Sequence, residues 1–189
     1  MGDGNRGHVC PFWIGYFLVS PLRRLLQDPR RIVGPHVKEG MIVLDIGCAM
    51  GFFSLPMARM VGPAGRVVCV DRQERMIRVL ERRVRRAGLG SRIEPRMCRG
   101  DSLEVGDLAG RVDFALAFAV VHEVPDPSAL FAQLREVVKP SGRILMAEPR
   151  RRVSDKALAI SAAAAERSGF TVVDRPLIRG SRAALLAKA

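Results

Sequence analysis

The stretch "VLDIGCAMGFF", residues 43–53, decides how the rest of the chain is interpreted. Its first half is a short apolar run typical of a buried strand, and Gly47 and Gly51 predict a tight turn. A helical pattern follows over residues 52–60, so the turn joins a strand to a helix. Backbone N–H groups at such a helix start can bind the anionic part of a nucleotide-like ligand. The stretch therefore predicts a ligand-binding loop.

The spacing of the glycines distinguishes two ligands, a dinucleotide and S-adenosylmethionine. The dinucleotide fingerprint GxGxxG, counted from Gly47, falls on Gly47, Ala49 and Phe52, so only one of its glycines is present. Asp45, just before the turn, would also repel a pyrophosphate. The pattern D-x-G-x-G-x-G instead reads Asp45, Gly47, Ala49 and Gly51, with only the middle glycine replaced. An acid suits the ammonium of S-adenosylmethionine, and the backbone N–H groups suit its carboxylate.

Acidic residues at the ends of the next two strand-like runs extend this site. Asp71 ends the run 66–71, where a carboxylate can accept hydrogen bonds from both ribose hydroxyls, as it also does in NAD enzymes. Asp101 and Ser102 follow the third run, and the Asp101 carboxylate can accept from an adenine amino group. Each acid alone is commonly a turn or cap residue. Together they indicate one cofactor site at the carboxyl ends of successive strands.

The order of the apolar runs predicts a doubly wound α/β fold. Strand-like runs cover residues 41–46, 66–71, 92–97, 112–120 and 142–148. Helical patterns cover residues 52–60, 73–87, 127–138 and 154–168. The near-continuous apolar character of the strands indicates a parallel sheet covered on both faces. The last two runs, 170–178 and 182–189, are too close in sequence for a parallel crossover, so we expect an antiparallel hairpin.

These motifs resemble those of class I S-adenosylmethionine-dependent methyltransferases over residues 35–189. The matching pieces are "VLDIGCAMGFFSLPMA", "VVCVDRQERMI", "RGDS", "VDFALAFAVVHEVPDPSALFAQLREVVKPSGRILMAEP" and the final hairpin. Within that superfamily the chain is most similar to small-molecule methyltransferases of the quinone-biosynthesis and arsenite-methylating type. The resemblance implies a Rossmann-like, seven-stranded, mostly parallel sheet of order 3-2-1-4-5-7-6 with strand 7 antiparallel.

The resemblance also implies roles for individual residues in binding S-adenosylmethionine and releasing S-adenosylhomocysteine. Its cofactor residues correspond here to Asp45, Gly47, Gly51, Asp71, Asp101 and Ser102. Other residues are expected to line the loop or flank the adenine and the transferring methyl group: Cys48, Ala49, Phe52, Arg72 and Phe118. No metal is expected in the site.

Three residues are candidates for a catalytic base. Methyl transfer is an in-line displacement at a sulfonium carbon, so positioning supplies much of the rate. A base is needed only when the acceptor must lose a proton. His122 and Glu123, in "AVVHEVPD", and Glu148, at the end of a strand, lie where a base would act. The alternatives are a loop histidine that packs or caps the next helix and a solvated carboxylate at the end of a strand.

The N-terminal residues 1–34 are expected to form a helical lid in front of a methyltransferase domain at 35–189. Cys10, Trp13, Tyr16 and Phe17 would then line the site of a small apolar or aromatic acceptor. The alternatives are an amphipathic helix packed on the edge of the sheet and a peripheral contact with a membrane surface.

Composition leaves three hypotheses for function open. The net charge of +12 comes mostly from arginines spread along the chain, so a nucleic-acid partner is possible but not favoured. The four cysteines contain no CxxC pair, which favours reduced thiols in the cytoplasm. The leading hypothesis is a small-molecule methyltransferase; the others are an RNA- or protein-modifying methyltransferase and a non-catalytic cofactor-binding partner subunit. The acceptor and the oligomeric state are left open.

Overall fold

The computed structural model of the chain describes residues 27–189. Its strands are β1 (Ile42–Ile46), β2 (Arg66–Asp71), β3 (Ile93–Met97), β4 (Val112–Phe118), β5 (Val138–Pro149), β6 (Phe170–Asp174) and β7 (Ser181–Lys188). Its α-helices are α3 (Pro29–Val33), α4 (Ser54–Met60), α5 (Glu74–Ala87), α6 (Pro127–Val137) and α7 (Asp155–Arg167). Two 3₁₀ turns complete the described elements, η1 (Gly106–Leu108) and η2 (Val121–Glu123).

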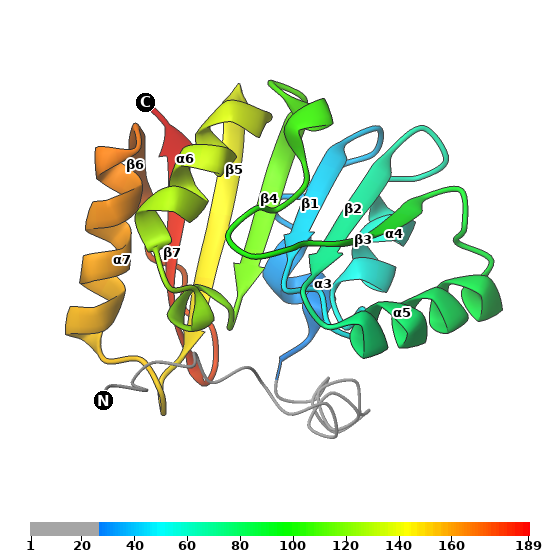
Figure 1. Cartoon of the computed structure of the whole chain (residues 1–189), viewed down its shortest axis with the longest axis horizontal. Coiled ribbons are helices and arrows are strands. Elements are labelled where there is room, and N and C mark those ends of the chain that lie inside the picture. The colour runs from blue at the N-terminus through cyan, green and yellow to red at the C-terminus, as the bar shows by residue number, and fades with distance from the viewer. Residues whose placement is uncertain (1–26) are drawn as a thin grey trace.

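The strands form one seven-stranded sheet of order β3-β2-β1-β4-β5-β7-β6 (Figure 1). Strands β1 to β5 pair in parallel, and β7 runs antiparallel to both β5 and β6. The predicted fold class and strand order are confirmed, including the closing hairpin. Because the first five strands are parallel, their carboxyl ends meet along one edge of the sheet, which lies at the bottom of Figure 1.

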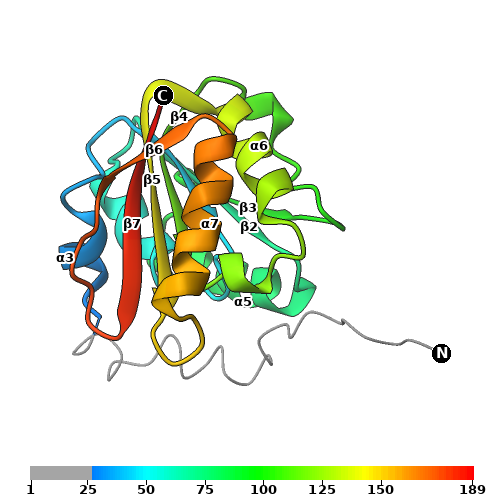
Figure 2. The ribbon, with the colours of Figure 1, turned by 90° about the vertical axis from the view of Figure 1, so that its left-hand side faces the viewer.

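Helices cover both faces of the sheet and divide the core into two layers. One layer packs side chains of α4 and α5 against β1 and β2 and includes Val33 of α3. The other layer packs α6 and α7 against the opposite face. Figure 2 shows α3 on one side of the sheet and α6 and α7 on the other. The alternation along each strand follows from the pleat, since Val67 and Cys69 belong to the first layer and Val68 and Val70 to the second.

Local sequence explains where the helices begin and end. Asp126 caps α6 by accepting from the backbone N–H of Ser128 at 2.8 Å, and Ser154 caps α7 in the same way. Gly88 ends α5 in the left-handed conformation, with φ 65°. No helix within residues 27–189 is long and apolar enough to cross a membrane.

Three strand boundaries differ from the sequence prediction by more than one residue. β6 ends at Asp174 and not at residue 178. β4 ends at Phe118 and not at residue 120, because Ala119 takes a left-handed φ of 59° and turns the chain into η2. β5 begins at Val138, earlier than the predicted residue 142. Val138 pairs with Val112 before the register shifts, so Lys139–Gly142 form an irregular insert within the strand and not a separate loop.

Candidate cofactor and acceptor site

A cavity of about 320 Å³ opens at the carboxyl edge of the sheet, between the ends of β1, β2 and β4. Twelve of the residues predicted from the sequence line it: Asp45, Gly47, Cys48, Ala49, Phe52, Asp71, Arg72, Asp101, Ser102, Phe118, His122 and Glu123. Gly51 and Glu148 do not line the cavity. Gly51 packs against Leu80 and Leu55, and Glu148 is buried behind the wall.

The glycine loop after β1 is built from alternating left-handed residues. Gly47, Ala49 and Gly51 have φ values of 66°, 47° and 80°. A Cβ atom on Gly47 would lie 2.7 Å from Cγ2 of Val120, so this position also lacks room for a side chain. The N–H groups of Gly47 and Cys48 donate to the carbonyl of Val70 at 2.9 and 3.1 Å, which ties the loop to β2. The motif spacing therefore reflects a backbone conformation that suits glycine.

Ala49 is the strained member of this loop, because a Cβ atom disfavours the left-handed conformation. We expect Ala49→Gly to raise the free energy of unfolding by about 1 kcal/mol, since the strain at φ 47° exceeds the entropy cost of an added glycine. The melting temperature should rise by about 2–4 °C for a chain of this size. Thermal unfolding of the two proteins measures the difference. A lower melting temperature for the variant would show that Ala49 is not strained.

Asp45 lies buried at the end of β1, beside the glycine loop. Its Oδ2 accepts a hydrogen bond from Ser54 Oγ at 2.5 Å, so α4 fixes the orientation of the carboxyl group. Burial raises the pKa of Asp45 to about 7; the Ser54 hydrogen bond opposes this shift and the charge of Asp71 adds to it. An approaching cation would stabilise the ionised form.

The raised pKa of Asp45 predicts how stability changes with pH. Between about pH 4 and pH 7 the unfolded chain has lost this proton while the folded chain keeps it, so its contribution to stability falls as pH rises. The asparagine side chain of the Asp45→Asn variant does not titrate in this range. The melting temperature of the unsubstituted protein, minus that of Asp45→Asn, should therefore fall steadily across this range in the absence of cofactor. A difference that is constant with pH would contradict the shifted pKa.

Asp71 connects β2 to the glycine loop. Its Oδ2 accepts from the N–H of Ala49 at 2.9 Å, and its Oδ1 accepts from the N–H of Gln73 at 2.8 Å. Burial raises the pKa of Asp71, and the hydrogen bonds from Gln73 and Ala49 oppose that shift. A carboxylate oxygen can accept more than one hydrogen bond, so both oxygens retain capacity toward the cavity. This arrangement fits the two hydroxyls of a ribose.

Asp101 and Ser102 reach the cavity from the segment between β3 and β4. The backbones of Arg99 and Ser102 exchange two hydrogen bonds, at 3.0 and 3.3 Å, which close a tight turn around Gly100 and Asp101. The Ser102 hydroxyl accepts from the N–H of Glu104 at 3.2 Å. The turn places the Asp101 and Ser102 side chains at the surface of the site, where they are exposed.

Three phenylalanines form an apolar wall. The ring centroids of Phe53 and Phe118 are 4.5 Å apart, and those of Phe52 and Phe53 are 5.1 Å apart. Phe53 is the N-cap residue of α4, Phe118 is the last residue of β4, and both line the cavity. Phe53 had no predicted role, although the doublet "FF" directly after the glycine turn is the feature of the sequence that indicates it. The wall provides a dry surface for an apolar or aromatic group.

His122 and Glu148, both candidates for the base, are hydrogen-bonded to each other. His122 Nδ1 and Glu148 Oε2 are 2.5 Å apart, and Glu148 Oε1 accepts from the N–H of Val121 at 2.8 Å. Glu148 is only 1% exposed, so its carboxylate faces the histidine and not solvent. The hydrogen bond that His122 donates to Glu148 raises the pKa of His122, while burial opposes the shift. Glu123 Oε1 lies 3.9 Å from His122 Nε2.

This arrangement has a chemical consequence for the histidine ring. A carboxylate that accepts at Nδ1 holds the neutral imidazole in the form that carries its proton there. The other nitrogen, Nε2, then has the lone pair. His122 lines the cavity, so a base held by a buried carboxylate is available at the wall of the site.

The charge of the cavity is opposite to the charge of the chain. Its wall contains five acidic side chains, Asp45, Asp71, Asp101, Glu123 and Asp126, and two arginines, Arg72 and Arg152. The whole chain has a net charge of +12. An acidic cavity attracts a ligand that has a sulfonium and an ammonium group, and it repels a pyrophosphate. The residues present therefore fit S-adenosylmethionine better than a dinucleotide.

A parallel α/β sheet with a glycine loop and an acidic cavity at its carboxyl edge defines the class of protein, and comparison with known proteins defines the family. The methyltransferase-domain family matches residues 37–174. The chain is 33% identical over 135 residues to nocamycin O-methyltransferase of Saccharothrix syringae, a match that covers 71% of this chain and 45% of the relative. It is 34% identical over 152 residues to ubiquinone biosynthesis O-methyltransferase of Azorhizobium caulinodans, covering 80% and 56%.

A solved structure agrees with these relatives. A SAM-dependent methyltransferase from Aquifex aeolicus superposes with a TM-score of 0.83 at 25% identity, covering 95% of this chain and 98% of that chain. The chain belongs to the methyltransferase-domain family, with the class I fold and S-adenosylmethionine as its cofactor. The predicted family and cofactor are confirmed. The chain spans about half the length of the curated relatives it matches.

Some predicted features lie outside the described residues. The acceptor-lining candidates Cys10, Trp13, Tyr16 and Phe17 all precede residue 27. The division into a segment at 1–34 and a domain at 35–189 therefore stays a prediction.

Proposed function

We propose that this protein transfers the methyl group of S-adenosylmethionine to a hydroxyl oxygen of a small apolar or aromatic acceptor. The observation that carries the proposal is the pair of His122 and buried Glu148, 2.5 Å apart at the wall of the cavity. A neutral amine or a thioether can attack the methyl group before any proton is lost, whereas a hydroxyl is a weak nucleophile until its proton is removed. A base held in one tautomer is therefore matched to an oxygen acceptor.

Each residue of the site has a separate task in this proposal. When bound, the cofactor supplies a methyl group on a positively charged sulfur. Asp45 would hold its ammonium, Asp71 its ribose, and Asp101 with Ser102 its adenine. His122 Nε2 would accept the hydroxyl proton of the acceptor, and Glu148 would stabilise the imidazolium that forms. The phenylalanine wall would exclude water from the reacting atoms.

The relatives support an oxygen acceptor. Two of the curated relatives are named O-methyltransferases, one for nocamycin and one for ubiquinone biosynthesis. The mostly apolar wall supports an acceptor with an apolar or aromatic body. The acidic charge of the cavity disfavours the alternative of an RNA acceptor, because phosphates would be repelled at its entrance.

In this proposal the N-terminal segment covers the acceptor. Gln27 donates to the carbonyl of Arg179 at 3.0 Å and to Ser181 Oγ at 3.2 Å. Ser181 pairs with Pro149 on β5, and Pro149 lines the cavity. The chain therefore reaches residue 27 beside the site, which supports a lid formed by the residues before it. Trp13, the only tryptophan, would report acceptor binding as a change in fluorescence.

The cytoplasm is the proposed location. The three cysteines within the described residues, Cys48, Cys69 and Cys98, are free thiols. Free thiols are typical of a reducing compartment.

Incubation with methyl-labelled S-adenosylmethionine tests the proposal. The labelled cofactor is added to a small-molecule extract, to a panel of catechols and hydroquinones, and to RNA and protein fractions. We expect label in an O-methylated small molecule. Label only in RNA or protein would favour the alternative of a macromolecular acceptor. Cofactor binding without transfer to any fraction would favour a non-catalytic partner subunit.

A further inference from the structure

The segment that carries Asp101 and Ser102 has little regular structure of its own. We call residues 98–108, between β3 and the end of η1, the adenine-side segment. Its described regular structure is the bridge between Arg99 and Ser102 and the single turn η1. Glu104, in its middle, has a left-handed φ of 55° although it is not a glycine. Such a conformation persists only where the surroundings hold it, so the contacts of this segment are informative.

Gln133 of α6 holds the cavity side of the segment. Its Nε2 donates to the carbonyl of Asp101 at 2.7 Å, and its Oε1 accepts from the N–H of Leu103 at 2.8 Å. One side-chain amide therefore binds the backbone on both sides of Ser102. Nε2 also donates to the carbonyl of Ala129 at 3.3 Å, one turn earlier in α6. Asp101, Ser102 and Leu103 line the cavity, whereas Gln133 does not.

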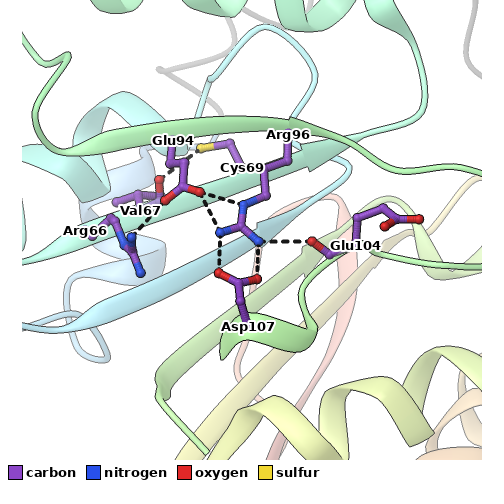
Figure 3. A network of polar contacts seen from close by, with 7 residues as sticks. All are labelled: Arg66, Val67, Cys69, Glu94, Arg96, Glu104 and Asp107. Carbon is purple, nitrogen blue, oxygen red and sulfur yellow. Dashed lines mark hydrogen bonds and ion pairs between the residues drawn. The ribbon is translucent and has the colours of Figure 1, made fainter. Parts of the chain in front are cut away.

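Arg96 of β3 holds the other side of the segment, as Figure 3 shows. Its guanidinium donates to both carboxylate oxygens of Asp107, at 2.6 and 2.8 Å, and to the carbonyl of Glu104 at 3.0 Å. The same group pairs with Glu94, which also pairs with Arg66 of β2. A bidentate arginine gives directional hydrogen bonds. The strained residue Glu104 is thus fixed from the edge of the sheet.

We propose that Gln133 is a positioning residue that sets the preference of the site for adenine, with Arg96 supporting the same segment from behind. The inference rests on the proposed function, in which Asp101 accepts from the adenine amino group. Asp101 is exposed, and no hydrogen bond or ion pair within residues 27–189 fixes the direction of its side chain. Its direction is therefore set by its backbone, and Gln133 holds that backbone. Loss of the amide would let the carboxylate move away from the amino group.

Selectivity between two bases tests this role. S-adenosylhomocysteine and S-inosylhomocysteine differ at the position of the adenine amino group, where the inosine compound has a carbonyl oxygen. Calorimetry gives both dissociation constants for the unsubstituted protein, for Gln133→Met and for Arg96→Met. Methionine has a similar length and a good helix propensity, so α6 should be kept. Glu136→Gln, an exposed position on the same helix, is the matched control.

The expected result is a change in selectivity and not only in affinity. The unsubstituted protein and Glu136→Gln should prefer the adenine compound. In Gln133→Met that preference should fall by about tenfold, the equivalent of one hydrogen bond to a charged group. Arg96→Met should change it in the same direction by a smaller factor. Thermal unfolding shows that each variant is folded at the temperature of the measurement.

Four outcomes would overturn the proposal. Equal weakening of both compounds would show that Gln133 has only a structural role. An unchanged preference in Gln133→Met, or no preference in the unsubstituted protein, would show that the segment does not select adenine. These three results leave the proposed methyl transfer intact. Failure of the unsubstituted protein to bind S-adenosylhomocysteine at all would overturn the proposed function and this inference together.

Discussion

Replacement of His122 by asparagine is expected to lower the turnover number by a factor of about 10² to 10⁴, the range found for loss of a general base. The asparagine amide can still donate to Glu148, which prevents an unpaired buried carboxylate. It has no atom that corresponds to Nε2, so the proton of the acceptor hydroxyl has no acceptor. Initial rates with labelled S-adenosylmethionine and a hydroxyl-bearing acceptor from the panel measure the loss.

Cofactor affinity is the control for this variant. His122 contacts Glu148 and lies near Glu123, and it is not assigned to the cofactor. The dissociation constant for S-adenosylhomocysteine should therefore stay within about threefold of the original. Unchanged turnover in His122→Asn would contradict the assignment of a base and would favour catalysis by positioning alone.

Substitutions of Glu148 and Glu123, the two carboxylates next to His122, test whether His122 acts as a base or has only a structural role. Glu148 raises the pKa of His122 above the ordinary value of 6.5. A base works in its neutral form, so turnover should rise with pH through this raised pKa. Glu148→Gln removes the charge, and we expect the acidic limb of the pH–rate profile to move to lower pH. Glu123→Gln, with Oε1 3.9 Å from Nε2, should change turnover far less. A larger loss in Glu123→Gln would assign the base to Glu123.

The parts of the site that could be predicted from the sequence are formed by residues that lie close together in the chain. The glycine turn and Asp45 are separated by a few residues, and a buried strand followed by glycines restricts the backbone to few conformations. Asp71 and Asp101 could be assigned to the same site because they lie at or shortly after the ends of β2 and β3. Parallel strands bring their carboxyl ends to one edge of the sheet. The α/β fold class could be predicted for the same reason, since each strand is a short apolar run and each helix has an apolar face. The order of the strands was implied by the resemblance to the family.

The parts that could not be predicted depend on contacts between distant residues. His122 and Glu148 were separate candidates, and their hydrogen bond across 26 residues requires that β4 and β5 be neighbours and that both side chains take matching rotamers. Gln133 gave no signal, because an amide on a helix is usually solvated. The left-handed conformation of Ala119, which ends β4 early, has no local signature because alanine rarely adopts it.

Substitution of Gly51 is the second change for which we expect a large effect, here on stability. Both its left-handed backbone and the side chains packed around it exclude a larger residue. Its φ is 80°, and a Cβ atom there would lie 2.5 Å from Cδ1 of Leu80 and 2.7 Å from Cδ1 of Leu55. Leu80 is fully buried on α5 and Leu55 is nearly so on α4. Neither leucine can move without disturbing the core layer between the helices and the sheet. The glycine loop is therefore held between two helices at this position.

We expect Gly51→Ala to lower the free energy of unfolding by roughly 3 kcal/mol, from left-handed strain and overpacking together. Gly88→Ala is the matched control, because Gly88 has a similar φ of 65° and no atom within 4 Å of the added Cβ. It should cost only about 1 kcal/mol, the strain term alone. Denaturant unfolding measures both losses, and their difference isolates the steric contribution.

Gly51→Ala and Gly88→Ala should also differ in their affinity for the cofactor product. A displaced Gly51 moves Ala49, whose N–H donates to Asp71 at 2.9 Å, and with it the carboxylate assigned to the ribose. S-adenosylhomocysteine should therefore bind Gly51→Ala at least about tenfold more weakly, the equivalent of about 1.4 kcal/mol. Gly88 ends α5 and does not line the cavity, so its variant should bind normally. Equal stability losses and equal affinities in the two variants would mean that the leucines yield to the added methyl group and that packing does not constrain the loop.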